Sequence, residues 1–244
     1  MLVKPHRKAK EILEEILVRQ THACGEDYPS VARTLNEIGI ALQHDRNFEE
    51  ALEKYNRALG IQLKILGGKH VDTADTYDNI GKVFLEQDKF EEAEEMFRKA
   101  LDIKLEILPE DKISELTDLY QNLGLSLKMQ DKFSEATKIQ KRSLSKLVEI
   151  HGEYHYSVAK AYIGVAGLLG DQNRMEDALQ LLDKSVEICN RLQGLGHRDA
   201  NVLPLALYMK ASYMEELGKF EGATEVLLTL LILHKETLEV KCTP

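Results

Sequence analysis

The sequence predicts an all-α fold, a solenoid built from antiparallel helix pairs. Three observations support this prediction: a phrase that recurs every 42 to 45 residues, apolar side chains spaced three, four and seven residues apart within each copy, and only 5 prolines in 244 residues. Repeats of about 20 to 50 residues indicate stacked supersecondary units. The apolar spacings place side chains on one helical face. Proline costs about 3 kcal/mol inside a helix, so its scarcity leaves long helices undisturbed.

The recurring phrase consists of a hydrophobic residue, two mostly polar residues and an alanine, as in Phe48-Glu49-Glu50-Ala51. Its five alanines are Ala51, Ala93, Ala136, Ala178 and Ala223. A small residue lies twelve positions before each of them: Gly39, Gly81, Gly124, Ala166 and Ala211. Small residues on two helices let the helices approach closely, so each copy predicts two antiparallel helices joined by a short turn.

The repeats also define the expected domain organisation. Residues 1–29 form an N-terminal capping helix and a linker, in which residues 6–23 align with a second helix that lacks its partner. Five tandem repeats over residues 30–238 and a tail at 239–244 follow, with repeats at about 30–72, 73–113, 114–155, 156–200 and 201–238. The stretch 226–234 is apolar on nearly every side. We expect a further helix of a longer chain, or a partner such as a second copy, to cover it, and the first alternative is favoured.

The pattern over residues 30–238 resembles the tetratricopeptide repeat. Three linkers are distinctive: Gly25-Glu-Asp-Tyr-Pro-Ser-Val-Ala32, Gly67-Gly-Lys-His-Val-Asp-Thr-Ala74 and Gly152-Glu-Tyr-His-Tyr-Ser-Val-Ala159. With Thr34-Leu-Asn-Glu-Ile-Gly39, they are similar to the kinesin light chain and nephrocystin-3 branch. The resemblance implies a right-handed superhelical solenoid whose first helices line a concave groove for cargo or scaffold peptides. The heptad coiled coil of kinesin light chains has no counterpart before residue 30.

The resemblance further implies which positions of each first helix face the groove. The candidate peptide-binding residues are Arg33, Asn36, Asp75, Asp78, Asn79, Lys82, Gln121, Asn122, Lys128, Lys160, Ile163, Gly164, Gly167 and Tyr208. The amides among them both donate and accept, so they can pair with a peptide backbone of any sequence. Asn36 matches the first member of the family's Asn-Asn pair, and Asn79 and Asn122 match the second. The alternative is a solvated polar face.

Charged residues and glycines give two further expectations for the groove. The four cations, Arg33, Lys82, Lys128 and Lys160, could hold an acidic peptide or a terminal carboxylate, or could form ion pairs with nearby aspartates instead. Gly164, Gly167 and Gly170 recur every three residues along one helix. We expect a recess there for a bulky ligand side chain, near Ile163 and Lys160. The alternative is close approach of the neighbouring helix.

Other functional classes have little support in the sequence. With 32 basic against 41 acidic residues and no basic cluster, we expect no nucleic-acid partner, and no apolar run is long enough for membrane insertion. No catalytic motif occurs, and we expect no cofactor. His151 and His155 are four residues apart but lack a third ligand, so no metal site is expected.

We therefore expect a non-catalytic adaptor or scaffold that binds a protein or peptide. The alternative is a regulatory or targeting part of a larger protein with an NTPase, ligase or transferase domain. Three scattered cysteines favour a cytoplasmic location, and the resemblance adds an association with the cytoskeleton.

Overall fold

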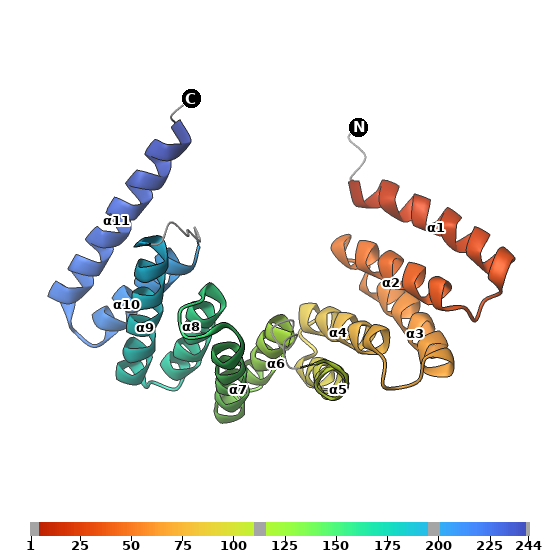
Figure 1. Cartoon of the computed structure of the whole chain (residues 1–244), viewed down its shortest axis with the longest axis horizontal. Helices are drawn as coiled ribbons and strands as arrows, with labels where there is room; N and C mark the ends of the chain where they lie inside the picture. Colours follow the sequence, from red (N-terminus) through yellow and green to blue (C-terminus); the bar gives the residue numbers. More distant parts are fainter. Residues whose placement is uncertain (1–4, 110–115, 195–200, 243–244) are drawn as a thin grey trace. The chain divides into compact units, whose positions relative to one another are not determined.

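A computed structural model describes residues 5–109, 116–194 and 201–242, and these ranges contain eleven α-helices and no strand. The predicted all-α repeat fold is confirmed (Figure 1). The helices are α1 (Pro5–Cys24), α2 (Pro29–His44), α3 (Phe48–Ile65), α4 (Val71–Glu86), α5 (Phe90–Ile107), α6 (Thr117–Met129), α7 (Phe133–His151), α8 (Tyr156–Asp171), α9 (Met175–Gly194), α10 (Val202–Glu216) and α11 (Phe220–Cys242).

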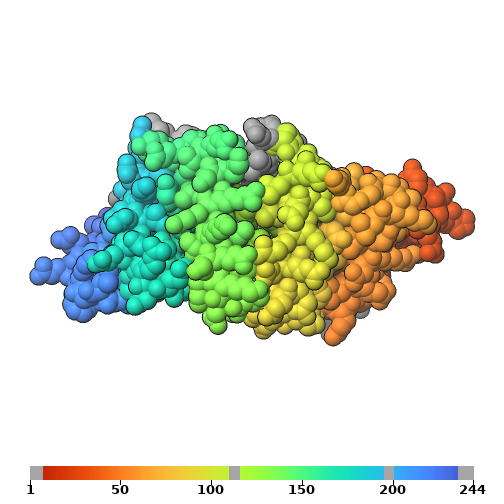
Figure 2. Space-filling view, turned by 90° about the horizontal axis from the view of Figure 1, so that it is seen from below, coloured from red at the N-terminus to blue at the C-terminus, as the bar shows by residue number. Residues whose placement is uncertain are grey.

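The chain divides into two compact units, one ending at Asp131 and the other beginning at Lys132. In the first unit α1 packs against α2, and the pairs α2/α3 and α4/α5 form hairpins. In the second unit the hairpins are α8/α9 and α10/α11, and α7 packs against α8. The space-filling view shows the helices of each unit as bands that follow one another in sequence order (Figure 2). The division falls inside the third expected repeat, between α6 and α7.

Each hairpin of the first unit is closed by an aromatic ring that packs on a glycine. Tyr55 of α3 and Phe97 of α5 are fully buried. A Cβ atom built on Gly39 would lie 2.5 Å from the Tyr55 ring, and one built on Gly81 would lie 2.7 Å from the Phe97 ring. No real Cβ comes this close to a ring atom, so the small residue of each first helix is a steric requirement.

The turn inside each hairpin uses one backbone conformation at equivalent positions. Residues Arg46, Asp88, Asp131, Asn173 and Gly218 all have positive φ, between 58° and 72°. After Arg46, Asp88, Asn173 and Gly218 the next residue donates its backbone N–H to a carbonyl five positions earlier, as Asn47 does to Leu42 at 2.9 Å. This arrangement is the Schellman motif, which satisfies carbonyls at the helix end. Asn, Asp and Gly tolerate the left-handed conformation best, and four of the five turns use one of them.

Histidines begin two of the first helices. His70 Nδ1 accepts the backbone N–H of Asp72 at 3.1 Å at the start of α4. His155 Nδ1 accepts the backbone N–H of Ser157 at 3.2 Å at the start of α8. Each imidazole therefore acts as an N-cap, a role that requires an unprotonated Nδ1.

Replacing Gly81 with alanine tests the steric requirement. The added methyl group overlaps the Phe97 ring, so we expect Gly81→Ala to lower the free energy of unfolding by about 2 kcal/mol. Gly60 of α3 has no atom within 4 Å of a built Cβ, so the control Gly60→Ala should raise it by roughly 0.5–1 kcal/mol. Urea unfolding measures both changes, and equal effects of the two substitutions would refute the packing argument.

The His155 cap predicts a dependence of stability on pH. Burial, and then the nearby His151, lower the pKa of His155 below its usual 6.5. The unfolded chain therefore binds a proton at a higher pH than the folded chain. The stabilisation is complete above pH 6.5 and is lost as the pH falls below it. Because the ring is largely exposed, the change is small. Between pH 7.5 and 5.5 the melting temperature should fall less for His155→Asn than for the wild type, because asparagine caps the helix but does not titrate. Thermal unfolding at the two pH values measures this difference.

Candidate functional site

The first helices of each unit form a layer of their own. In the first unit α2 contacts α4 and α4 contacts α6, and in the second α8 contacts α10. Within the described ranges no comparable contact joins α3 with α5 or α9 with α11. First helices therefore lie closer together than second helices, as on the inner side of a curved stack. We call the side chains of α2, α4 and α6 that are not buried the first-helix surface of the first unit.

The candidate amides on this surface fall into two groups. Asn36 donates to the Thr76 hydroxyl at 2.7 Å, and Thr76 in turn is 2.8 Å from Gln62 Oε1, so Asn36 joins two repeats. Asn79, Gln121 and Asn122 are each half-buried. None of these three makes a hydrogen bond with any residue in the described part of the chain. Their amide groups are therefore available to a ligand, whereas the Asn36 nitrogen is engaged.

Most candidate charges on the first-helix surface have partners within the protein. Arg33 lies 3.5 Å from Asp72, and Lys82 lies 2.7 Å from Asp78. Asp75 is held by Lys104 of α5 at 2.6 Å, so it turns toward the second helix of its own repeat. Lys128 is half-buried and also has an interaction partner. These pairs correspond to the alternative of intramolecular ion pairing, and each contributes only about 0–1 kcal/mol at the surface.

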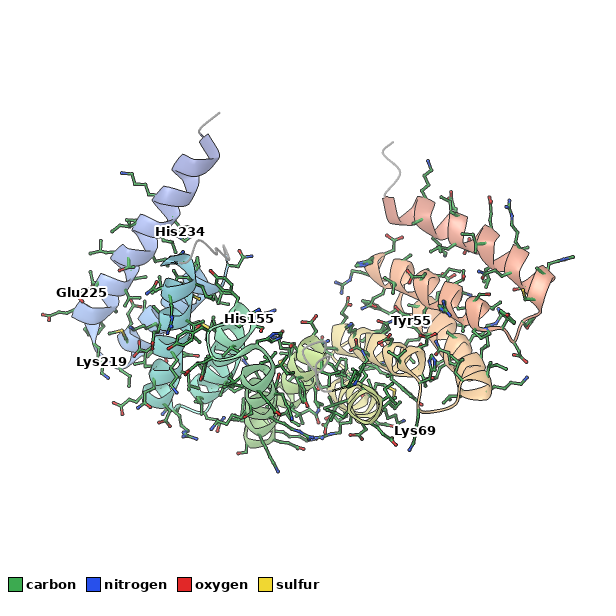
Figure 3. The ribbon with its side chains drawn as sticks, viewed as in Figure 1. Tyr55, Lys69, His155, Lys219, Glu225 and His234 are labelled. Carbon is green, nitrogen blue, oxygen red and sulfur yellow. The ribbon has the colours of Figure 1, made fainter. Side chains whose placement is uncertain are left out.

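Tyr55 marks an acidic zone that the sequence did not reveal. It reaches from α3 to α2, where its hydroxyl donates to Gln43 Oε1 at 3.2 Å (Figure 3). Burial raises the pKa of this phenol, and the negative charges of Glu37, Glu86 and Asp78 raise it further. Three carboxylates of α2 and α4 therefore lie around the Tyr55 hydroxyl, and Lys82 pairs with one of them, Asp78.

The glycine stripe of α8 lies against α10. A Cβ on Gly167 would lie 3.6 Å from Met209 Cε, and the Tyr213 ring occupies the space where a Cβ of Gly170 would stand. Only Gly164 lacks a neighbour from α10, its closest being Gln140 Oε1 at 3.7 Å. At Gly170 the stripe therefore serves close helix packing, and the Tyr213 ring fills the expected recess there, whereas a Cβ on Gly167 would make only an ordinary contact with Met209.

The other candidates of the second unit differ in exposure. Ile163 is only 6% exposed and belongs to the core, so it does not line an open surface. Lys160 is exposed, and Tyr208 of α10 is 61% exposed. Leu205, one turn before Tyr208, is 48% exposed. Lys160 on α8 and the two apolar side chains on α10 are thus the exposed candidates of this unit.

The histidine pair has a structural role. The His151 and His155 rings stack with centroids 4.4 Å apart, and His155 Nδ1 is used by the α8 cap. Over the ranges that the structure describes, no three His, Cys, Asp or Glu side chains are grouped closely enough to hold a metal ion. None of the helices searched there combines the length and apolarity required to cross a lipid bilayer.

Solved structures with the same arrangement of helices come from several organisms. BtubC (BKLC) from P. vanneervenii is 17% identical with a TM-score of 0.79, covering 96% of this chain and 93% of its own. TPR-like repeats of the kinesin light chain type from Podosopora anserina are 18% identical with a TM-score of 0.72, covering 86% and 98%. YrrB, a TPR protein with an unusual peptide-binding site, is 20% identical with a TM-score of 0.55, covering 93% and 98%. These likenesses show a shared fold.

Sequence comparison identifies the family. No curated protein sequence matches the chain significantly. The tetratricopeptide repeat family matches over residues 2–64, 30–106 and 115–198, which together make up most of the chain. The helix pairs, their repeated turns and these sequence matches show that the chain belongs to the tetratricopeptide repeat family.

Proposed function

We propose that this protein is an adaptor or scaffold that binds an extended peptide segment of a partner protein on the first-helix surface of the first unit, in the manner of kinesin light chain-like proteins. One observation carries the proposal: Asn79, Gln121 and Asn122 present amides with no hydrogen-bond partner in the described part of the chain. Asn79 and Asn122 occupy equivalent positions in successive repeats, on helices that contact each other.

The chemistry of these residues fits a peptide backbone. Each side-chain amide offers donors and an acceptor, so it can form paired hydrogen bonds with a main-chain amide without reading the sequence. Leu125, one turn after Asn122 on α6, is 44% exposed and can contact an apolar side chain of the ligand. Peptide binding by a tetratricopeptide repeat protein has a precedent in YrrB, which has an unusual peptide-binding site.

The charges do not favour an acidic ligand on this unit. Arg33 and Lys82 are already paired, and carboxylates surround Tyr55. A neutral or weakly basic peptide with one apolar anchor suits this surface best. On the second unit Lys160, Leu205 and Tyr208 form a separate candidate contact for a partner, chosen for their exposure.

The proposed role is non-catalytic and cytoplasmic. The charged side chains on the first-helix surface are mostly engaged in ion pairs within the protein. Cys24 and Cys189 form no disulfide within the described ranges, which suits a reducing compartment.

Removing two amides tests the peptide site. A peptide selected from a displayed random library is titrated by fluorescence anisotropy against the intact protein and Asn79→Ala/Asn122→Ala. Because each lost hydrogen bond costs about 1 kcal/mol, we expect the double substitution to weaken binding about tenfold or more. Asn56→Ala, an exposed asparagine on the second helix α3, is the matched control and should leave the affinity unchanged. Equal affinities of all three proteins would refute the amide site.

Asn36 should behave differently from Asn79. Asn36→Ala removes the hydrogen bond to Thr76 between two repeats, so we expect it to lower the free energy of unfolding by about 1 kcal/mol. Asn79→Ala removes no hydrogen bond between described residues and should change the stability little. Chemical denaturation of the two variants decides the assignment: equal losses would contradict the division of the amides into structural and ligand-binding groups.

A further inference from the structure

The outer side of α11 differs from the outer sides of the other second helices. Ala223, Val226, Leu230 and Leu233 turn toward the core of the unit. Leu228 and Ile232, on the opposite side, are 54% and 60% exposed. They lie four residues apart and so share one helical face. Figure 3 shows Glu225 on the side of α11 that faces away from the rest of its unit.

Comparison between repeats shows that these two apolar residues are exceptional. Leu228 and Ile232 lie five and nine residues after the alanine of the recurring phrase. At the first position the other second helices carry Asn56, Arg98, Lys141 and Asp183, and at the second they carry Gly60, Asp102, Ser145 and Glu187. All eight are polar or glycine. Only α11 places apolar side chains at both positions.

These positions are not where one repeat meets the next. The residue eight after the alanine is apolar in every second helix, and in α3 this residue, Leu59, packs against a core that includes Ile80 and Val83 of α4. In α11 it is Leu231. The positions of Leu228 and Ile232 do not serve the stacking of repeats elsewhere in the chain. Large exposed apolar side chains at such positions indicate contact with a separate partner.

The charges on the same face indicate what that partner is. Glu225, Leu228, Ile232 and Lys235 form a stripe with spacings of three, four and three residues, which is the spacing of a coiled-coil seam. When the stripe is aligned with an antiparallel copy of itself, the spacing matches. Each apolar residue then lies opposite an apolar residue, and Glu225 lies opposite Lys235. The stripe, about 15 Å long, is therefore complementary to an antiparallel copy of itself.

We propose that α11 pairs with α11 of a second copy of this chain, antiparallel and around a two-fold axis near Leu230. In this pair Leu228 contacts Ile232 of the other copy, and Glu225 faces Lys235. Each contact occurs twice, as a two-fold interface requires: where residue i of one copy meets residue j of the other, residue j of the first copy meets residue i of the second. Ile232 also borders a hollow of mixed character, which the second copy would cover and whose lining includes Val186, Leu203 and Leu207 as well as Asn190, Gln193 and Thr229. The interface is small, so the dimer is expected to dissociate on dilution.

Sedimentation equilibrium over a concentration series at low salt tests the apolar contact. The wild-type chain should associate as its concentration rises. Leu228→Lys/Ile232→Ser gives α11 the two residues that α7 carries at the same positions, Lys141 and Ser145, and should remain monomeric. Both side chains are exposed, so circular dichroism and thermal unfolding should show an intact fold. A monomeric wild type at the highest soluble concentration, or association by this variant equal to that of the wild type, overturns the proposal.

Charge reversal tests the antiparallel pairing itself. Glu225→Lys and Lys235→Glu each place like charges opposite each other twice in the dimer, so each should lower the association constant about tenfold. The double variant Glu225→Lys/Lys235→Glu restores both contacts and should associate as the wild type does. Glu53→Lys makes the same charge reversal at the equivalent position of α3 and should have no effect. If the double variant is as weak as the single variants, the partner is not an antiparallel second copy.

Discussion

The structure depends on the close approach of two helices at one small residue in each repeat. In the first unit Gly39 and Gly81 let the rings of Tyr55 and Phe97 lie directly on the helix backbone. Each ring buries a large apolar area while it fixes the rotation of the second helix about its axis. Once that rotation is fixed, the other faces of the two helices follow. Both helices turn one face to the next repeat, the first helix turns another to the first-helix surface, and the second helix turns another to the outside. The contact between the ring and the glycine therefore determines which polar side chains lie on each exposed face.

Much of the fold could be predicted because the repeat positions have direct physical meanings. The alanine and the small residue define the contact between the two helices of a repeat, and their recurrence gives the number of repeats. The turns were predicted as short connections, and the structure adds their reason. A left-handed residue recurs at Asp88 and Asn173, where a Schellman motif requires it. The linker glycines Gly67 and Gly152 also have positive φ and end the preceding helices.

The candidate site was harder to predict, because a helical position shows which way a side chain points but not whether a neighbour already uses it. Asn36 and Asn79 both face the first-helix layer, yet Thr76 engages the first. A signal for this was present. Thr34 and Thr76 recur 42 residues apart, as do Gln20 and Gln62, and both Thr–Gln pairs form a 2.8 Å hydrogen bond.

The glycine stripe of α8 illustrates the same difficulty. Gly167 and Gly170 predict open space only if no large side chain lies opposite, and the neighbouring helix supplies Met209 and Tyr213. Whether a missing side chain makes a recess or a packing surface depends on the partner helix, and one helix considered alone does not contain that information. Comparing the facing residues of neighbouring first helices would have identified Tyr213 as the side chain that occupies the space beside Gly170.

Repetition makes each repeat a control for the others. A position that serves stacking must keep its character in every copy, since the same neighbour meets it each time. A position whose residue type differs in one copy is not needed for stacking there and can serve another contact. The residues Leu228 and Ile232 depart in this way in α11, and the amides Asn79, Gln121 and Asn122 are polar groups that stacking does not use. The first set lies on the outer side of one unit and the second on the first-helix surface of the other. In the two proposals the chain holds a peptide and a second copy of itself through different faces, and neither contact uses the residues that close the hairpins.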